Sequence, residues 1–175
     1  DGEPNYEHHP IDPYLRDWKP EYGRYTDYDV RKQAYRAVFA GACGHTYGSH
    51  SVWQFWSNQR IPTTFASPTW EEAIHGPGAN QIGHLRSLML RYPYFSRIPD
   101  QTLLIGQKEP KPVTDPQEQK SDPLRAEYCV ATRDREGTYA LVYCPVGGKE
   151  MQLNLGSLKL PVQAEWFDPR TGARH

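Results

Sequence analysis

The chain has 175 residues, which is enough for one ordinary domain or two small ones. Its 20 Lys and Arg nearly balance its 21 Asp and Glu, and it has no basic stripe, which excludes a protein that tracks nucleic-acid phosphates. The longest unbroken apolar run, Tyr139 to Cys144, is far shorter than the ~20 residues that span a bilayer. The sequence therefore also excludes a transmembrane segment.

The apolar residues are mostly aromatic. Leu, Ile, Val and Phe make up only about 18% of the chain, whereas it contains 12 Tyr and 5 Trp. A low aliphatic content indicates disorder only when the net charge is high, and here it is −1. Amphipathic rings in such numbers suit a wet, concave binding surface or a protein–protein contact.

The first hundred residues follow the order loop, helix, strand, loop, helix, which is typical of a β/α architecture. Residues 1–27 show no sustained period and predict a long ordered loop. A helix is predicted from Asp29, capped by Thr26 or Asp27 and ended by the glycines at 41 and 44. Cys43–Tyr47 is then predicted to be a short buried strand.

Two further helices are predicted before residue 92. Thr69 and Glu72 have the spacing of a capping box, which indicates a brief helix ended by Gly76-Pro77-Gly78. A second helix is predicted from about Ala79 to Arg91, because its apolar residues recur on one face.

The composition changes near residue 106. Residues 106–125 carry four Pro and eight charges with only two apolar residues, which is typical of a linker or a long surface loop. Short apolar or alternating runs then follow, separated by turn signals, and they predict the antiparallel strands of a small β-sandwich. The predicted strands are Tyr128–Arg133, Thr138–Cys144, Glu150–Leu155 and Val162–Phe167.

The three cysteines form neither a zinc pattern nor a disulfide framework. Cys129 and Cys144 flank a predicted hairpin, and a two-residue turn at Glu136-Gly137 would place them directly opposite each other. The sequence does not decide whether these two cysteines form a disulfide, and two buried free thiols are the favoured interpretation.

The densest polar cluster is the first nine residues, which contain Glu3, Glu7, His8 and His9. Two carboxylates three or four residues apart, beside aromatic rings, could act as acid, base or nucleophile, as glycoside cleavage requires. A solvated acidic segment is the alternative.

Other chemistries are less well supported. The histidines at 8, 9, 45 and 50 lack the spacing of a known metal motif, so we expect neither a metal nor another cofactor. A Cys43–His45 nucleophile is disfavoured because Cys43 lies in the predicted buried strand. The glycine-rich run 41–48 lacks the lysine of a P-loop and is expected to precede a strand rather than a helix, so close approach of the backbone to a neighbour is the favoured interpretation.

An aromatic group follows the predicted strand. It consists of Tyr47, Trp53, Gln54 and Trp56, and rings beside amide donors are what a sugar site uses. The alternative is that Trp53 and Trp56 simply belong to the core.

Several blocks of the sequence resemble the apiosidase-like family of glycoside hydrolases. The resemblance is carried by five blocks, in the family's order along nearly the whole chain: Asp1-Gly2-Glu3-Pro4-Asn5-Tyr6-Glu7, residues 40–48 (AGACGHTYG), Trp53, residues 76–81 (GPGANQ) and residues 166–172 (WFDPRTG). It implies the C-terminal part of a (β/α)₈ barrel followed by a small antiparallel β-sandwich, often labelled as collagen-binding. The implied organisation is barrel segment 1–100, linker 101–126 and sandwich 127–175.

The resemblance also implies a retaining mechanism on the side chains of plant-type polysaccharides. Glu3 corresponds to the nucleophile at the end of the seventh barrel strand, and active sites of such barrels lie at the carboxyl ends of the strands. The substrate pocket would be lined by Tyr6, Glu7, His45, Tyr47 and Trp53. The general acid would come from an earlier strand, because no residue of this chain can be assigned to that role.

The expected partners are a carbohydrate substrate and the missing N-terminal part of the barrel. The family likeness implies an extracellular or periplasmic location, although no signal segment is present in this chain. The alternative is a non-catalytic carbohydrate- or protein-binding β-sandwich module that uses residues 1–100 as a scaffold.

Overall fold

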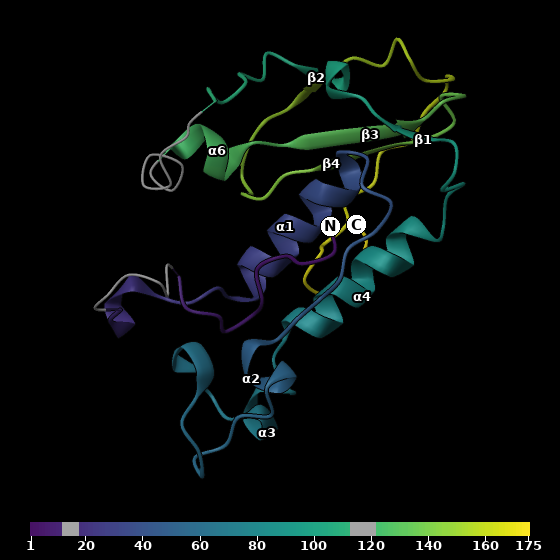
Figure 1. The fold of residues 1–175 in the computed structure, drawn as a ribbon. Helices are drawn as coiled ribbons and strands as arrows, with labels where there is room; N and C mark the ends of the chain where they lie inside the picture. Colours follow the sequence, from purple (N-terminus) through teal and green to yellow (C-terminus); the bar gives the residue numbers. More distant parts are fainter. Residues whose placement is uncertain (12–17, 113–121) are drawn as a thin grey trace. The chain divides into compact units, whose positions relative to one another are not determined.

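The computed structural model of the chain describes residues 1–11, 18–112 and 122–175 (Figure 1). Its contacts divide the chain into two units. Unit 1 comprises Asp1–Tyr35, Cys43–Met89 and Glu165–His175, and unit 2 comprises Arg36–Ala42 and Leu90–Ala164. No helix in the described part of the chain has the length and apolar character needed to cross a membrane.

Unit 1 is built from helices and loops. It contains most of α1 (Asp27–Phe39), together with α2 (His50–Trp53), α3 (Trp70–Ala73), α4 (Gly78–Met89) and the 3₁₀ turns Pro20–Tyr22 and Thr63–Phe65. At the start of α1, the Asp29 carboxylate accepts hydrogen bonds from the N–H and hydroxyl of Thr26, both at 2.9 Å, so the side chain that stabilises this end is that of Asp29. At α3, the Glu72 carboxylate accepts from the same two groups of Thr69.

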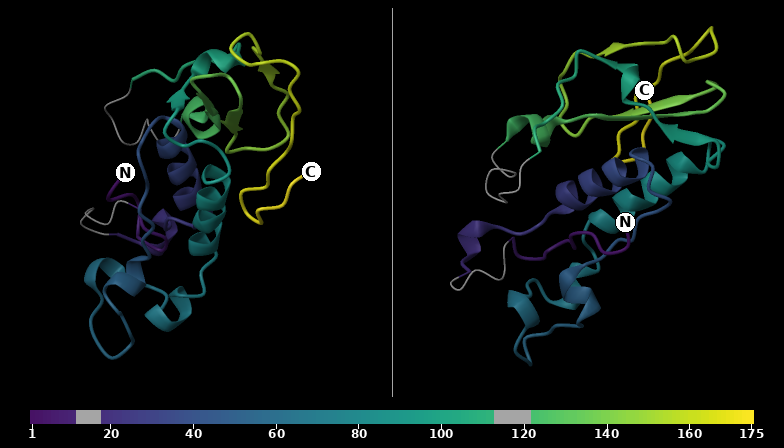
Figure 2. Two further views of the ribbon diagram at one scale, coloured as in Figure 1. Left: turned by 90° about the vertical axis from the view of Figure 1, so that its right-hand side faces the viewer. Right: turned by 45° about the horizontal axis from the view of Figure 1, so that its top comes forward.

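Helices α1 and α4 lie side by side and supply much of the core of unit 1 (Figures 1 and 2). Val30 and Ala34, four residues apart on α1, are buried, as are Leu85 and Leu88 on α4. This burial follows directly from the apolar spacing of the two segments. The predicted helices are therefore confirmed, with ends that differ from the expected ones by about two residues.

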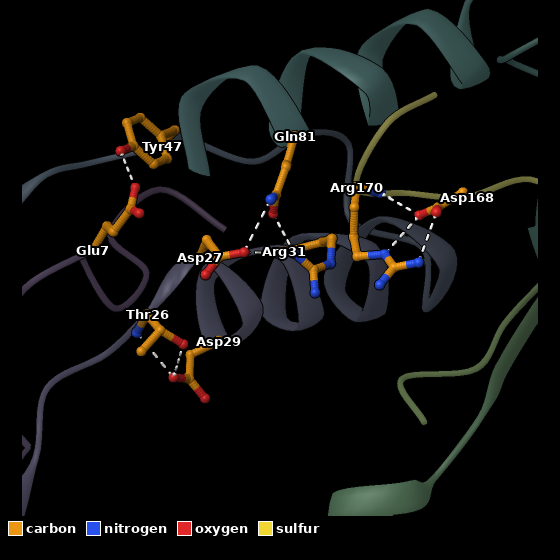
Figure 3. A network of polar contacts seen from close by, with 9 residues as sticks. All are labelled: Glu7, Thr26, Asp27, Asp29, Arg31, Tyr47, Gln81, Asp168 and Arg170. Carbon is orange, nitrogen blue, oxygen red and sulfur yellow. Dashed lines mark hydrogen bonds and ion pairs between the residues drawn. The ribbon is translucent and has the colours of Figure 1, made fainter. Parts of the chain in front are cut away.

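A polar network joins the same two helices (Figure 3). Gln81 of α4 donates to the Asp27 carboxylate at 2.9 Å and accepts from Arg31, which also pairs with Asp27 at 3.1 Å. Burial alone would raise the pKa of Asp27, but the hydrogen bonds from Gln81 and Arg31 hold that pKa below its usual value. The network therefore keeps Asp27 charged where α1 meets α4.

Unit 2 contains two small antiparallel sheets. The first has the strand order β1-β3-β4, and the second pairs β2 with β5. Their bounds are β1 Arg97–Pro99, β2 Leu104–Ile105, β3 Val130–Asp134, β4 Ala140–Tyr143 and β5 Gln152–Leu153. A 3₁₀ turn at Gln101–Leu103 and the short helix α6 at Pro123–Glu127 complete the unit.

The β3–β4 hairpin confirms the two strands predicted at residues 128–133 and 138–144, with bounds that differ by one or two residues. Val130 pairs with Tyr143 and Arg133 with Ala140, and the buried Asp134 carboxylate accepts from the backbone of Thr138 at 2.6 Å. In the turn, Gly137 has φ +73°, a conformation that glycine adopts without strain.

Other predicted strands are wrong in place or extent. Residues 43–47 form no strand, and Cys43 is exposed rather than buried. Residues 162–167 take part only in an isolated bridge between Phe167 and Arg174. The physical reason is that an extended, apolar segment becomes a strand only when a neighbour offers a matching row of backbone groups, which a local pattern does not reveal. The predicted linker contains β2 at its start and α6 at its end, and its central residues 113–121 lie outside the described residues.

Candidate active site

Two loop segments of unit 1 run beside each other in parallel. The backbone N–H of Thr46 donates to the carbonyl of Asp1 at 3.2 Å, and that of Glu7 donates to the carbonyl of Gly48 at 2.9 Å. The N–H of His50 in turn donates to the carbonyl of Glu7 at 2.8 Å, and Glu7 and Ser49 form a parallel bridge. The sequence motifs at residues 1–7 and 44–50 are therefore adjacent in space.

The Glu7 carboxylate is the buried centre of this arrangement. It is 2% exposed, and the Tyr47 hydroxyl donates a hydrogen bond to its Oε2 at 2.5 Å (Figure 3). Burial, together with the neighbouring Glu7 carboxylate, raises the pKa of Tyr47, so this phenol stays protonated and remains a donor. A buried carboxylate with a fixed phenol donor is held in one position.

Glycines make room for this carboxylate. Gly76 and Gly78, at the connection between α3 and α4, both face it, and a Cβ atom on Gly78 would overlap Glu7 Oε2. A Cβ on Gly48 would likewise lie 2.5 Å from the ring of Tyr6. The glycine-rich blocks of the sequence thus serve close packing around Tyr6, Glu7 and Tyr47.

Glu3, the predicted nucleophile, is exposed. None of the described residues hydrogen-bonds or ion-pairs with its carboxylate, which differs in this respect from Glu7 four residues later. One carboxylate of the pair is thus open to a ligand, whereas the other is committed to the protein.

His45 is a buried imidazole with unused polar atoms. Its side chain is 2% exposed, both ring nitrogens lack a hydrogen bond to the described residues, and the nearest carboxylate oxygen, on Asp1, lies 3.5 Å from Nδ1. Burial lowers the pKa of His45, so the ring is neutral at ordinary pH. Two unsatisfied ring nitrogens are typical of a group that meets its partner in a ligand.

His50 has a defined tautomer. Its Nδ1 accepts from the Trp53 indole at 3.2 Å, and its Nε2 faces the carbonyls of Thr63 and Thr64 at 3.2 and 3.1 Å. Burial lowers the pKa of His50, so we assign it as neutral with the proton on Nε2. The His50 ring therefore orients the Trp53 indole. The sequence pattern had not linked these two side chains.

The Trp53 ring is 53% exposed, which excludes the interpretation that it belongs to the core. Further along the same loop region, Phe55 is exposed and packs edge-on against Trp70 at a ring distance of 5.7 Å. Phe55, Thr64 and Phe65 all have φ near +50°, a strained conformation for residues with side chains. Backbone strain and exposed rings thus occur together between residues 53 and 65.

The described residues contain no cluster of three or more His, Cys, Asp or Glu side chains that could hold a metal ion. The exposure of Cys43 removes the reason for disfavouring it as a nucleophile, but His45 does not hydrogen-bond to it. The carboxylates remain the groups best suited to catalysis.

Comparison with known families gives two adjoining matches. Residues 1–96 match the family described as "Apiosidase-like, catalytic domain". Residues 98–175 match the family described as "Putative collagen-binding domain of a collagenase". A search of curated protein sequences found no match.

Two solved structures are similar over nearly the whole chain. One, described as a glycoside hydrolase, is 32% identical with a TM-score of 0.78, over 99% of this chain and 35% of its own. The other, a glycoside hydrolase family 5 protein from Bacteroides vulgatus, is 32% identical with a TM-score of 0.76, over 97% and 33%. The chain spans about a third of the length of these structures.

Proposed function

Since this chain belongs to the apiosidase-like family of glycoside hydrolases, we propose that it forms the C-terminal part of a retaining enzyme that removes side chains from plant-type polysaccharides. The observation that carries the proposal is the contrast between two neighbouring carboxylates, Glu3 open to solvent and Glu7 buried against Tyr47. A retaining hydrolase needs one carboxylate free to attack the sugar and a rigid surround that aims it.

In this proposal Glu3 is the nucleophile. Its carboxylate attacks the anomeric carbon of the sugar, and the bond to the leaving-group oxygen breaks as a general acid protonates that oxygen. Water then attacks the glycosyl–enzyme ester, the same general acid now accepts its proton, and Glu3 is released. The acid belongs about 5 Å from Glu3 on an earlier part of a barrel, outside these 175 residues.

The remaining site residues position this nucleophile and the sugar. Glu7 and Tyr47 hold the segment that carries Glu3 against residues 44–50. His45, whose ring nitrogens make no hydrogen bond to the described residues, is assigned to a sugar hydroxyl, and Trp53 offers a half-exposed face for the C–H side of a sugar ring. Tyr6, packed on Gly48, completes the wall.

We also propose a cellular location and a structural partner for the enzyme. A carbohydrate polymer outside the cell requires export, so we propose an extracellular or periplasmic location. The rest of the barrel is the proposed partner of unit 1.

The test uses the full-length polypeptide that contains this chain, assayed on aryl glycosides and pectic oligosaccharides. We expect Glu3→Gln to lower kcat by about 10³-fold or more with unchanged thermal unfolding. Glu21→Gln, an exposed carboxylate on the first 3₁₀ turn, is the matched control and should retain full activity.

A rescue experiment separates the nucleophile from a positioning residue. Glu3→Ala should regain activity with azide and yield a glycosyl azide of inverted configuration, because azide occupies the space of the lost carboxylate. A Glu3→Gln variant with wild-type turnover would remove Glu3 from the mechanism.

The match of residues 98–175 to a collagen-binding family favours a second candidate function. Unit 2 would then serve as a protein- or carbohydrate-binding module. Sedimentation of the intact chain with insoluble collagen and with pectin separates the two ligands. If the chain binds neither, the module function is rejected.

A further inference from the structure

We propose that Cys129 and Cys144 form an intrachain disulfide that staples the β3–β4 hairpin when the protein meets a disulfide oxidant. The pair lies in unit 2 and takes no part in the proposed hydrolase site. The proposal therefore stands or falls independently of the proposed function.

The strand register places the two residues opposite each other. Val130 pairs with Tyr143, Ala131 with Val142 and so on along the hairpin, so the next position outward pairs Cys129 with Cys144. The Cys129 thiol donates to the carbonyl of Glu127 at 3.6 Å and the Cys144 thiol donates to Met151 Sδ at 2.9 Å, so each thiol has only a weak local partner that oxidation would displace. No rearrangement of the strands is needed to bring them together.

Hydrogen-bonded and non-hydrogen-bonded residue pairs alternate between β3 and β4, and this alternation makes the position of Cys129 suitable for a disulfide. The N–H of Asp134 donates to the carbonyl of Tyr139 at 3.2 Å, so these residues face each other through a hydrogen bond. Because hydrogen-bonded and non-hydrogen-bonded pairs alternate, Cys129, five residues from Asp134, belongs to a non-hydrogen-bonded pair.

The backbone of Cys129 confirms that phase. Its N–H donates to Oε1 of Gln107 at 2.9 Å, and its carbonyl accepts from Gln101 and Gln107 at 3.1 and 2.9 Å, so neither group points to β4. Non-hydrogen-bonded pairs have Cα atoms about 4.5 Å apart, within the 4.4–6.8 Å that disulfides span. The staple therefore fits the existing backbone.

The local charges favour the reactive form of the pair. The neighbouring Cys144 thiol, helped by Lys149 and Arg36, lowers the pKa of Cys129 to about 7, although burial opposes the shift. Its neighbour Cys129 and burial raise the pKa of Cys144. One proton of the pair is thus lost near neutral pH, which supplies a thiolate.

Oxidation proceeds by thiol–disulfide exchange with a low-molecular-weight disulfide or a dithiol–disulfide oxidoreductase. The thiolate of the pair attacks one sulfur of the oxidant, forming a mixed disulfide and releasing one thiolate. The second cysteine then loses its proton, attacks the protein sulfur of the mixed disulfide and releases the second thiol. The protein loses two electrons and two protons, and the oxidant disulfide becomes two thiols.

The test uses the intact chain with Cys43→Ser, which leaves only the pair. The folded protein is incubated with glutathione buffers of increasing oxidised fraction, alkylated and digested with trypsin. Cleavage after Arg125, Arg133, Arg135 and Lys149 separates the cysteines, so we expect the peptides 126–133 and 136–149 to be joined by a disulfide. Closing a loop of about 15 residues should raise the Tm of the oxidised form by roughly 6–12 °C.

The variants Cys129→Ser and Cys144→Ser are the controls, and neither should show the linked peptides or the rise in Tm. The proposal is overturned if the peptides remain unlinked in fully oxidised buffer. It is also overturned if linkage appears only after denaturation, or if a stable glutathione adduct on one cysteine is the sole product.

Discussion

The bond between Tyr47 and Glu7 offers a sharp test of the candidate site. Replacing Tyr47 by Phe keeps the ring and removes only the hydroxyl, which leaves Glu7 Oε2 without its donor. At 2% exposure, Glu7 cannot replace that donor by bulk water. A hydrogen bond to a charged group contributes about 1.5–3 kcal/mol, so we expect Tyr47→Phe to lower the free energy of unfolding by about 2 kcal/mol. For a chain of this length, that corresponds to a Tm lower by about 4–8 °C.

The measurement is urea and thermal unfolding followed by far-ultraviolet circular dichroism. Tyr22→Phe, which removes a hydroxyl from a solvent-exposed ring, is the matched control and should change stability by less than about 0.5 kcal/mol. A double-mutant cycle with Glu7→Gln should give a coupling energy of about 1 kcal/mol or more. Additive effects of the two substitutions would refute the inference that Tyr47 anchors Glu7.

The same pair predicts a pH dependence. The pKa of Tyr47 is raised in the folded state above its ordinary value of 10.0, so the folded protein keeps a proton that the unfolded chain releases. The stability advantage of wild type over Tyr47→Phe should be constant below pH 10 and decrease as the pH rises above it. A constant advantage up to pH 12, measured on both proteins in parallel, would contradict the shift.

Three further substitutions test other parts of the fold. The hydrogen bonds from Arg170 lower the pKa of Asp168 to about 2, so wild type should lose stability relative to Asp168→Asn as the pH falls from 3.8 towards 2, and parallel acid titrations check this. Thr69→Ala removes the capping box of α3 and should cost about 1 kcal/mol in urea unfolding, with no effect indicating a dispensable cap. Leu85→Ala opens a cavity under α4 and should cost about 2–5 kcal/mol, whereas Ile61→Ala, at 93% exposure, should change stability by less than about 0.5 kcal/mol. Equal effects of these last two in thermal unfolding would show that Leu85 is not in the core.

Local patterns predicted the features that depend on nearby residues. Thr26 and Asp29 cap α1, Thr69 and Glu72 cap α3, and the apolar spacing of residues 82–89 places one face of α4 in the core. The observed β3–β4 register is the one that a two-residue turn at Glu136-Gly137 would give, an alternative that the sequence left open. These features are local, since a cap, a helical face or a tight turn is complete within a few residues.

Features that depend on distant residues could not be predicted in this way. The exposure of Cys43, the missing strand at 43–47 and the pairing of β1 with β3 depend on which backbone groups lie alongside. The roles of Gly76 and Gly78 are similar, because the carboxylate that they accommodate comes from Glu7, about seventy residues earlier in the chain.

The candidate site shows the same division between sequence and tertiary structure. By itself the sequence determined its chemical components, namely two carboxylates, an imidazole, a phenol and an indole near two glycine-rich blocks, and their family resemblance. Only the tertiary structure decided that Glu7 is buried while Glu3 is open, and that His50 orients Trp53. The reason is that burial and hydrogen-bond partners are set by segments that meet only on folding, whereas residue type and local spacing are present in the chain beforehand.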